Sequence, residues 1–127
     1  MVKEKSMERY AMIMRPGEEM MLLHCWPGDT LELQTMQKIV GGYIETVPVE
    51  LDKKWSGEEG VGLQMIINEE GKLMGLPLNV AATEMANLRK DCIVGTAILM
   101  GVKGENLIGL TREAAVNIAE KWRKGTC

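Results

Sequence analysis

The sequence contains no phenylalanine and a single histidine among its 127 residues, and these absences exclude several kinds of site. A metal site built from several histidines cannot form, and a His–carboxylate–nucleophile site would depend on His24 alone. His24 lies inside the apolar run MMLLHCW, without a nucleophile motif around it. We therefore interpret His24 as a core or edge histidine and predict no catalytic and no metal-binding residues.

Cysteine is also scarce, with three residues and no C-x-x-C pair. An odd number of cysteines at these spacings does not form a disulfide framework. We interpret Cys25 and Cys92 as buried free thiols and Cys127 as exposed. The chain is long enough to bury a core without disulfides or metal. We expect a flexible charged arm, residues 1–10, followed by a single domain, residues 11–127.

Long hydrophobic runs and an excess of basic charge are missing as well. No apolar run approaches the roughly 20 residues of a transmembrane helix, and no apolar segment typical of a signal peptide follows the charged N-terminus. The formal net charge of −3 provides no basic surface for nucleic acid. We therefore expect a cytoplasmic protein that has neither a membrane nor a nucleic acid as its partner.

Methionine, in contrast, occurs 11 times. Its flexible thioether side chain fills irregular gaps in cores and also makes adaptable binding surfaces. Both interpretations stay open for the methionines of residues 12–21. A small domain with exposed strand edges and many methionines commonly associates with copies of itself, so we expect a homo-oligomer.

The order of apolar and turn-forming segments predicts an α+β fold, in which a mainly antiparallel sheet carries two to three packed helices. Alternating or β-rich segments predict strands, and apolar residues spaced three and four positions apart predict helices. The predicted strands are residues 10–15, 20–26, 43–51, 61–68, 72–76, 91–102 and 106–110, and the predicted helices are residues 29–40, 80–90 and 112–124.

Single residues mark where several of these elements begin or end. Asp29 and Glu32 have the spacing of a capping box at the start of the first helix. Asn79 and Thr111 are suitable N-caps for the second and third helices. Pro48 cannot donate to a ladder, so its strand should lie at an edge of the sheet.

We expect the sheet to be organised around residues 61–79, which predict a β-hairpin with its turn at residues 68–71. The strand within residues 91–102 is apolar on both faces and should be central. Gly95 leaves space there for close approach. Either a neighbouring element or a ligand could fill that space.

Some loop residues have both a functional and a structural interpretation. Trp55 either offers a stacking platform for a planar ligand or packs back on the edge of the domain. The acidic pairs Glu18-Glu19, Glu58-Glu59 and Glu69-Glu70 lie in predicted turns, where solvation is the ordinary explanation. Turns rarely provide the pocket that raises the pKa of a catalytic carboxyl, so we expect no catalysis.

The segment after the predicted hairpin is the best candidate for a binding site. Pro77, Asn79 and Thr83 lie close together in the sequence, and Arg89 follows one or two helical turns later. Asn recognises amide and base edges, and Arg is the usual partner of phosphate or carboxylate. In the alternative interpretation, Asn79 caps a helix and Arg89 is a solvated surface charge.

Three ordered blocks resemble the DUF3846 family, which comprises small proteins of unassigned function from bacteria, phages and mobile elements. The blocks are VGGYIE at residues 40–45, NEEGKL with GLPLN within residues 68–79, and IVGTA at residues 93–97. The resemblance covers roughly residues 11–118 and implies no catalytic residue and no cofactor. We include Tyr43 and Asn68, which lie in these blocks, among the candidate ligand-binding residues.

The context of this family implies a function. Small phage-encoded domains without catalytic motifs are often inhibitors of host defence. We expect a non-enzymatic binding protein in the cytoplasm of a bacterial host cell, where it sequesters a phosphate-bearing, nucleotide-derived immune signal. One alternative is a protein–protein inhibitor or adaptor that acts on a defence factor through the methionine-bearing hairpin or an edge strand. A further alternative is a small hydrolase of the nucleotide signal.

Overall fold

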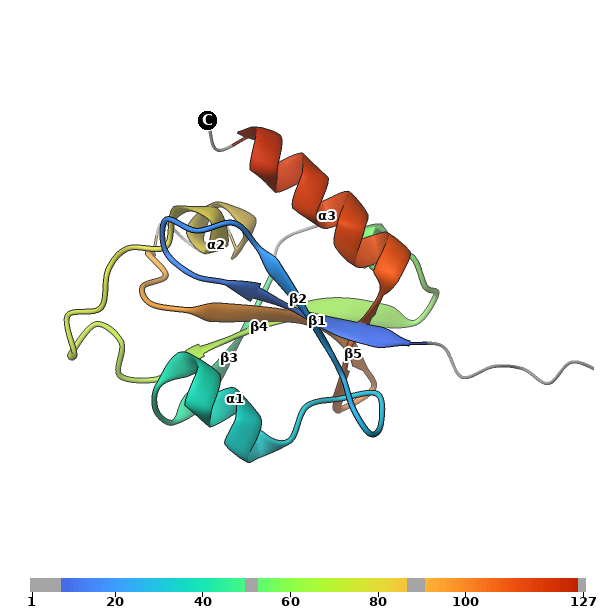
Figure 1. Ribbon diagram of the computed structural model, residues 1–127, viewed down its shortest axis with the longest axis horizontal. Helices are drawn as coiled ribbons and strands as arrows, with labels where there is room; N and C mark the ends of the chain where they lie inside the picture. Colours follow the sequence, from blue (N-terminus) through green and yellow to red (C-terminus); the bar gives the residue numbers. More distant parts are fainter. Residues whose placement is uncertain (1–7, 50–52, 87–90, 126–127) are drawn as a thin grey trace, which may run out of the picture.

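The computed structural model describes residues 8–49, 53–86 and 91–125, which form a seven-stranded antiparallel sheet with helices on both faces (Figure 1). In chain order, the elements are β1 (Arg9–Met14), β2 (Met21–His24), α1 (Leu33–Val40), β3 (Ile44–Pro48), the 3-10 helix η1 (Lys53–Ser56), β4 (Val61–Asn68), α2 (Val80–Ala86), β5 (Ala97–Lys103), β6 (Asn106–Ile108), β7 (Leu110–Thr111) and α3 (Arg112–Gly125). The predicted α+β fold with a mainly antiparallel sheet is confirmed.

The main strands follow the order β2-β1-β5-β4-β3, while β6 pairs with β5 and β7 pairs with β1. β5 lies in the middle of the sheet, and its first five residues are buried, as the apolar character of both its faces predicted. β2 and β3 are the outer strands of this order. β3 ends at Pro48, which confirms the predicted edge position.

The helices form one layer on each face of the sheet (Figure 1). α2 and α3 cover the face that carries Met12, Met14, Met65 and Leu99, and α1 covers the face that carries Ile13. Burial of these apolar side chains on both faces is the main force that stabilises the fold. Within the described ranges, no helix is long and apolar enough to cross a membrane.

The N-caps of α2 and α3 are those that the sequence predicted. The main-chain N–H of Ala82 donates to Asn79 Oδ1 at 3.1 Å, and that of Ala114 donates to Thr111 Oγ1 at 3.1 Å. Each side-chain oxygen satisfies a first-turn N–H group that has no partner within the helix.

The predicted start of α1 is wrong. The helix begins at Leu33 after Glu32, which makes no side-chain capping bond. The main-chain oxygen of Asp29 instead accepts a hydrogen bond from Gly109 N at 2.8 Å, which holds Asp29 beside the β6–β7 connection. The end of α1 is as predicted, because Gly41 adopts a φ of 86°.

The second strand of the hairpin predicted over residues 61–79 is also wrong. β4 pairs with β3 on one side and with β5 on the other, so residues 72–76 have no free edge of β4 to join. They form consecutive turns, in which Met74 N donates to Glu70 O at 3.0 Å. Leu73, expected in a strand, is 87 % exposed.

The close approach expected at Gly95 is made by a side chain of this chain. Gly95 has a φ of 78°, and a Cβ atom at this position would lie 2.7 Å from Leu76 Cδ1. Packing of Leu76, one of the two alternatives, therefore explains the glycine.

β1 begins at Arg9, one residue before the strand predicted over residues 10–15. Its first two residues, Arg9 and Tyr10, pair with Thr111 and Leu110 of β7. Residues 1–7 lie outside the described part of the chain.

Candidate functional site

Asn79 joins the start of α2 to two other segments of the chain. Its side chain is buried, and its Nδ2 donates to the main-chain oxygens of Met14 at 2.9 Å and Gly95 at 2.8 Å. Its Oδ1 accepts the capping bond from Ala82. The amide therefore has partners within the chain at both polar atoms, which favours the structural interpretation of this residue.

Asn68 has a similar role at the end of β4. Its Nδ2 donates to Val40 O at 3.1 Å, and its Oδ1 accepts from Glu70 N at 2.8 Å. A Cβ atom at Gly42 would lie 3.0 Å from Asn68 Nδ2, so the glycine leaves room for this side chain. The neighbouring Tyr43 is 71 % exposed.

The structure brings Pro77, Asn79 and Thr83 together along one loop, residues 93–95. Thr83 Oγ1 accepts from Ile93 N at 2.8 Å and donates to Ile93 O at 3.3 Å, and Pro77 O accepts from Gly95 N at 2.7 Å. Arg89 lies outside the described residues. Thr83 thus contacts this loop through its side chain and Pro77 through its main chain. Ligand binding by the predicted set stays a prediction.

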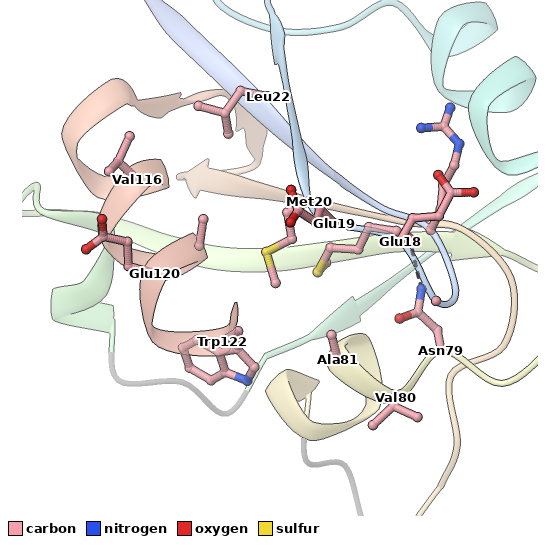
Figure 2. Close-up of a pocket in the computed structure, with 14 residues that line it drawn as sticks. Glu18, Glu19, Met20, Leu22, Asn79, Val80, Ala81, Val116, Glu120 and Trp122 are labelled. Carbon is pink, nitrogen blue, oxygen red and sulfur yellow. Dashed lines mark hydrogen bonds between the residues drawn. The ribbon is translucent and has the colours of Figure 1, made fainter. Parts of the chain in front are cut away.

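A groove of about 620 Å³ lies between α2, α3 and the β1–β2 connection (Figure 2). Its apolar lining comes from all three elements: Met20 and Leu22 from the β1–β2 hairpin, Val80 from α2, and Val116 and Trp122 from α3. The groove is lined by Met14, Arg15, Gly17, Glu18, Glu19, Met20, Leu22, Asn79, Val80, Ala81, Val116, Ala119, Glu120 and Trp122.

Three of the four charged residues in the described part of the groove lining are acidic. Glu18 and Glu19 from the hairpin and Glu120 from α3, which we call the rim glutamates, are exposed. Among the lining residues that the structure describes, Arg15 is the only cationic one, and its Nη1 contacts Met21 Sδ at 3.9 Å. Met21 pairs with Ile13 of β1, whose side chain lies in the core under α1, so the guanidinium is directed away from the groove. An apolar surface beside carboxylates suits a ligand that is both apolar and cationic.

The sequence interpretation missed the groove because its lining comes from three distant segments. Leu22 is part of an edge strand, and Val116 lies on an exposed part of α3. One local signal was available, since the pair Glu18-Glu19 directly precedes Met20 and Met21. An acidic turn next to an apolar edge is a pattern that a docking surface can produce.

A second cavity, of about 900 Å³, lies beside η1 and the start of α3. Trp55 lines it and packs edge-on against Trp122, with ring centroids 6.0 Å apart. Its lining mixes acidic and basic side chains, and Glu58 is paired with Arg9 at 2.7 Å. The contact with Trp122 favours the packing interpretation of Trp55, and the mixed charges select no ligand class.

The single histidine and the two cysteines of the described residues lie in different surroundings. His24 is exposed at the sheet edge, with its ring 5.3 Å from that of Tyr10, in agreement with its interpretation as an edge histidine. Cys25 is buried as predicted, but Cys92 is exposed, which corrects the prediction for that thiol. Burial raises the pKa of the Cys25 thiol to about 11. Across the described residues, no three His, Cys, Asp or Glu side chains are arranged to hold a metal ion.

Comparison with known proteins identifies the family. The model of the domain of unknown function DUF3846 matches residues 7–123, nearly the whole chain. A search of curated proteins and a search of solved structures found no match. The resemblance of the three sequence blocks is thus confirmed over a longer range, and the chain belongs to the DUF3846 family.

Proposed function

We propose that this chain is a non-enzymatic binding protein whose ligand is a basic, amphipathic segment of another protein. The observation that carries the proposal is the apolar groove between α2 and α3 with the rim glutamates beside it. Val80 and Val116 are 50 % and 37 % exposed, so they offer apolar area for a ligand to bury. The rim glutamates supply acceptors for Lys or Arg side chains at the border of that contact.

The charge of the groove favours a cationic ligand over a phosphate. A phosphate placed about 4 Å from one glutamate would be repelled by roughly 1 kcal/mol even in bulk water, and by more near a protein surface. The side chains of Asn79 and Thr83, which motivated the nucleotide hypothesis, bind the main chain instead. The groove therefore supports the protein–protein alternative more strongly than sequestration of a nucleotide signal.

Helix-in-groove recognition is the mode that suits this site. An amphipathic helix presents apolar side chains at positions i, i+3, i+4 and i+7, and cationic residues beside that stripe would face the rim glutamates. In this proposal, the helix belongs to the host defence factor that the family's phage context predicts.

A pair of synthetic peptides tests the proposal. One is an amphipathic helix with leucines on one face and lysines flanking them, and the other has glutamate in place of every lysine. We expect the lysine peptide alone to bind in isothermal titration calorimetry. Glu120→Lys should weaken binding of the lysine peptide roughly tenfold, because it reverses one rim charge. A tenfold change corresponds to about 1.4 kcal/mol in binding free energy. Glu105→Lys makes the same charge reversal in the exposed turn between β5 and β6 and should leave the affinity unchanged.

Other outcomes identify the alternatives. Equal binding of both peptides, or equal effects of the two lysine variants, would show that the groove is not the binding site. Retention of a cyclic dinucleotide or an ADP-ribose derivative that is recovered intact after heat denaturation, without peptide binding, would favour sequestration. Progressive conversion of the nucleotide to a product would favour the hydrolase.

A further inference from the structure

The outer strands β2 and β3 differ in how well they are protected against pairing with another strand. β3 contains Pro48, which cannot donate a hydrogen bond, and the charged Glu45. β2, with the sequence MLLH, contains neither proline nor a charged residue, and three of its four residues are exposed. Proline and charge are the usual protection of edge strands, so β2 is an edge open to pairing.

The pairing of β2 with β1 decides which main-chain groups of β2 point outward. Cys25 N donates to Arg9 O at 2.8 Å, and the register continues with Tyr10 opposite His24. Hydrogen-bonded and non-hydrogen-bonded pairs alternate along an antiparallel ladder. Leu22 and His24 therefore direct their main-chain N–H and C=O groups away from β1, toward the open edge.

We propose that two copies of this chain associate through β2, antiparallel and around a two-fold axis at Leu23. Leu22 of each copy then faces His24 of the other, so the outward groups of both residues are paired in both strands. A register that places Leu22 opposite Leu22 of the second copy does not pair Leu22 with His24. The same is true of a register that places His24 opposite His24. The interface is self-complementary, because β2 supplies both members of every pair and brings no like charges together.

Trp26 supports this arrangement from outside the strand. It is 75 % exposed, and its ring lies 6.1 Å from that of His24, so the ring of Trp26 extends the aromatic contact between His24 and Tyr10 along this edge. Continuing the proposed register by two residue pairs on each side places Trp26 opposite Met20 of the second copy. A large aromatic side chain with its face free is the kind of residue that anchors protein interfaces.

The dimer would complete the groove described above, since Met20 and Leu22 belong to its lining. Trp26 of the second copy would close the groove at its hairpin end, so that each site contains residues of two chains. The use of the completed groove as a binding site depends on the proposed function, whereas the dimer depends only on the β2 edge.

Sedimentation velocity of the full chain over a range of micromolar concentrations tests the association. We expect a dimer, and we expect Trp26→Ala to weaken it by roughly tenfold or more, as for a buried aromatic anchor. Tyr43→Ala is the matched control, because it removes an aromatic ring of similar exposure next to the opposite edge strand, β3. A monomer at all concentrations, or equal weakening by both variants, would overturn the proposal.

Cysteines introduced one at a time into a Cys92→Ser, Cys127→Ser background test the register. This background retains only the buried Cys25. Leu23→Cys should form an intermolecular disulfide under mild oxidation, because residues opposite each other in a non-hydrogen-bonded pair have Cα atoms about 4.5 Å apart, within the range of disulfides. Leu22→Cys and His24→Cys should crosslink much more slowly, since neither residue lies opposite the same residue of the second copy. Preferential crosslinking at position 22 or 24 would overturn the proposed register.

The two proposals fail separately. A native dimer that binds neither peptide refutes the groove proposal and leaves the β2 interface intact. A monomeric native chain that still binds the lysine peptide refutes the β2 interface and leaves the groove proposal intact.

Discussion

Arg9 donates two hydrogen bonds to the carboxylate of Glu58, from Nη1 at 2.8 Å and from Nη2 at 2.7 Å. The pair joins the first residue of β1 to the turn before β4, and only 14 % and 23 % of the two side chains are exposed. The hydrogen bond from Arg9 holds the pKa of the Glu58 carboxyl below its ordinary value. An acidic pair that the sequence assigned to a solvated turn therefore includes one residue that stabilises the fold.

Glu58→Gln should lower the free energy of unfolding by about 1 kcal/mol at pH 7, because a two-bond pair with this geometry exceeds the median for surface ion pairs. The folded-state pKa is depressed, so the stabilisation is fully present above the ordinary glutamate pKa of about 4.3. It is lost as the pH falls through the lower folded value. In urea denaturation, the difference in the free energy of unfolding between the native chain and Glu58→Gln should shrink as the pH falls from 7 into the acid range. Glu59→Gln, at an exposed neighbouring position, should change little at any pH.

Asn79→Ala should destabilise the fold by roughly 2–4 kcal/mol. The substitution removes the N-cap of α2 and leaves the main-chain oxygens of Met14 and Gly95 without their buried donor. Asn117→Ala, on an exposed position of α3, should change stability by no more than about 0.5 kcal/mol. Equal effects of the two variants in chemical denaturation would contradict a structural role for Asn79.

Gly95→Ala should cost roughly 2–4 kcal/mol, because a side chain there meets both a positive φ and Leu76. Gly104 also has a positive φ, of 62°, but open space around it, so Gly104→Ala should cost only about 1 kcal/mol. In a Leu76→Ala background, the cost of Gly95→Ala should fall toward the value for Gly104→Ala. Thermal denaturation of the four variants measures this coupling, and a cost independent of Leu76 would rule out the contact as its cause.

The two described cysteines should react at very different rates. With a pKa of about 11, the Cys25 thiol is only about one part in a thousand thiolate at pH 8, and it is buried as well. Cys92 is exposed and should react rapidly with a thiol-specific reagent such as dithionitrobenzoate. Cys92→Ser should remove one rapidly reacting thiol, whereas Cys25→Ser should leave the rapid phase unchanged. A rapid phase that loses one thiol in Cys25→Ser would contradict this assignment.

Predictions that depend on short-range chemistry agree well with the structure. Asn79 and Thr111 cap their helices, Gly41 ends α1, and Pro48 lies at an edge of the sheet. Each of these positions is decided by one or two neighbouring residues. The amphipathic pattern of α3 and the apolar character of β5 on both faces were equally visible, because burial follows directly from the residue types involved.

Predictions that depend on competition between distant segments were less successful. Residues 72–76 have a strand-like sequence, but β3 and β5 already occupy both edges of β4. Asp29 has the spacing of a cap, but its main chain binds Gly109 instead. In both cases a partner far away in the sequence decided the outcome, and local propensity carries no information about such a partner.

The sequence by itself determined the α+β class, the presence of most helices and strands, the family and the absence of recognisable catalytic motifs, because all of these follow from composition, spacing and local patterns. Only the tertiary structure decided that the amides of Asn68 and Asn79 bind the main chain, since their partners are up to 65 positions away. It likewise assembled the groove and its rim glutamates from the hairpin, α2 and α3, and left the uncharged strand β2 at an open edge. Sites of this kind depend on strand order and helix placement, which a linear pattern of residues does not specify.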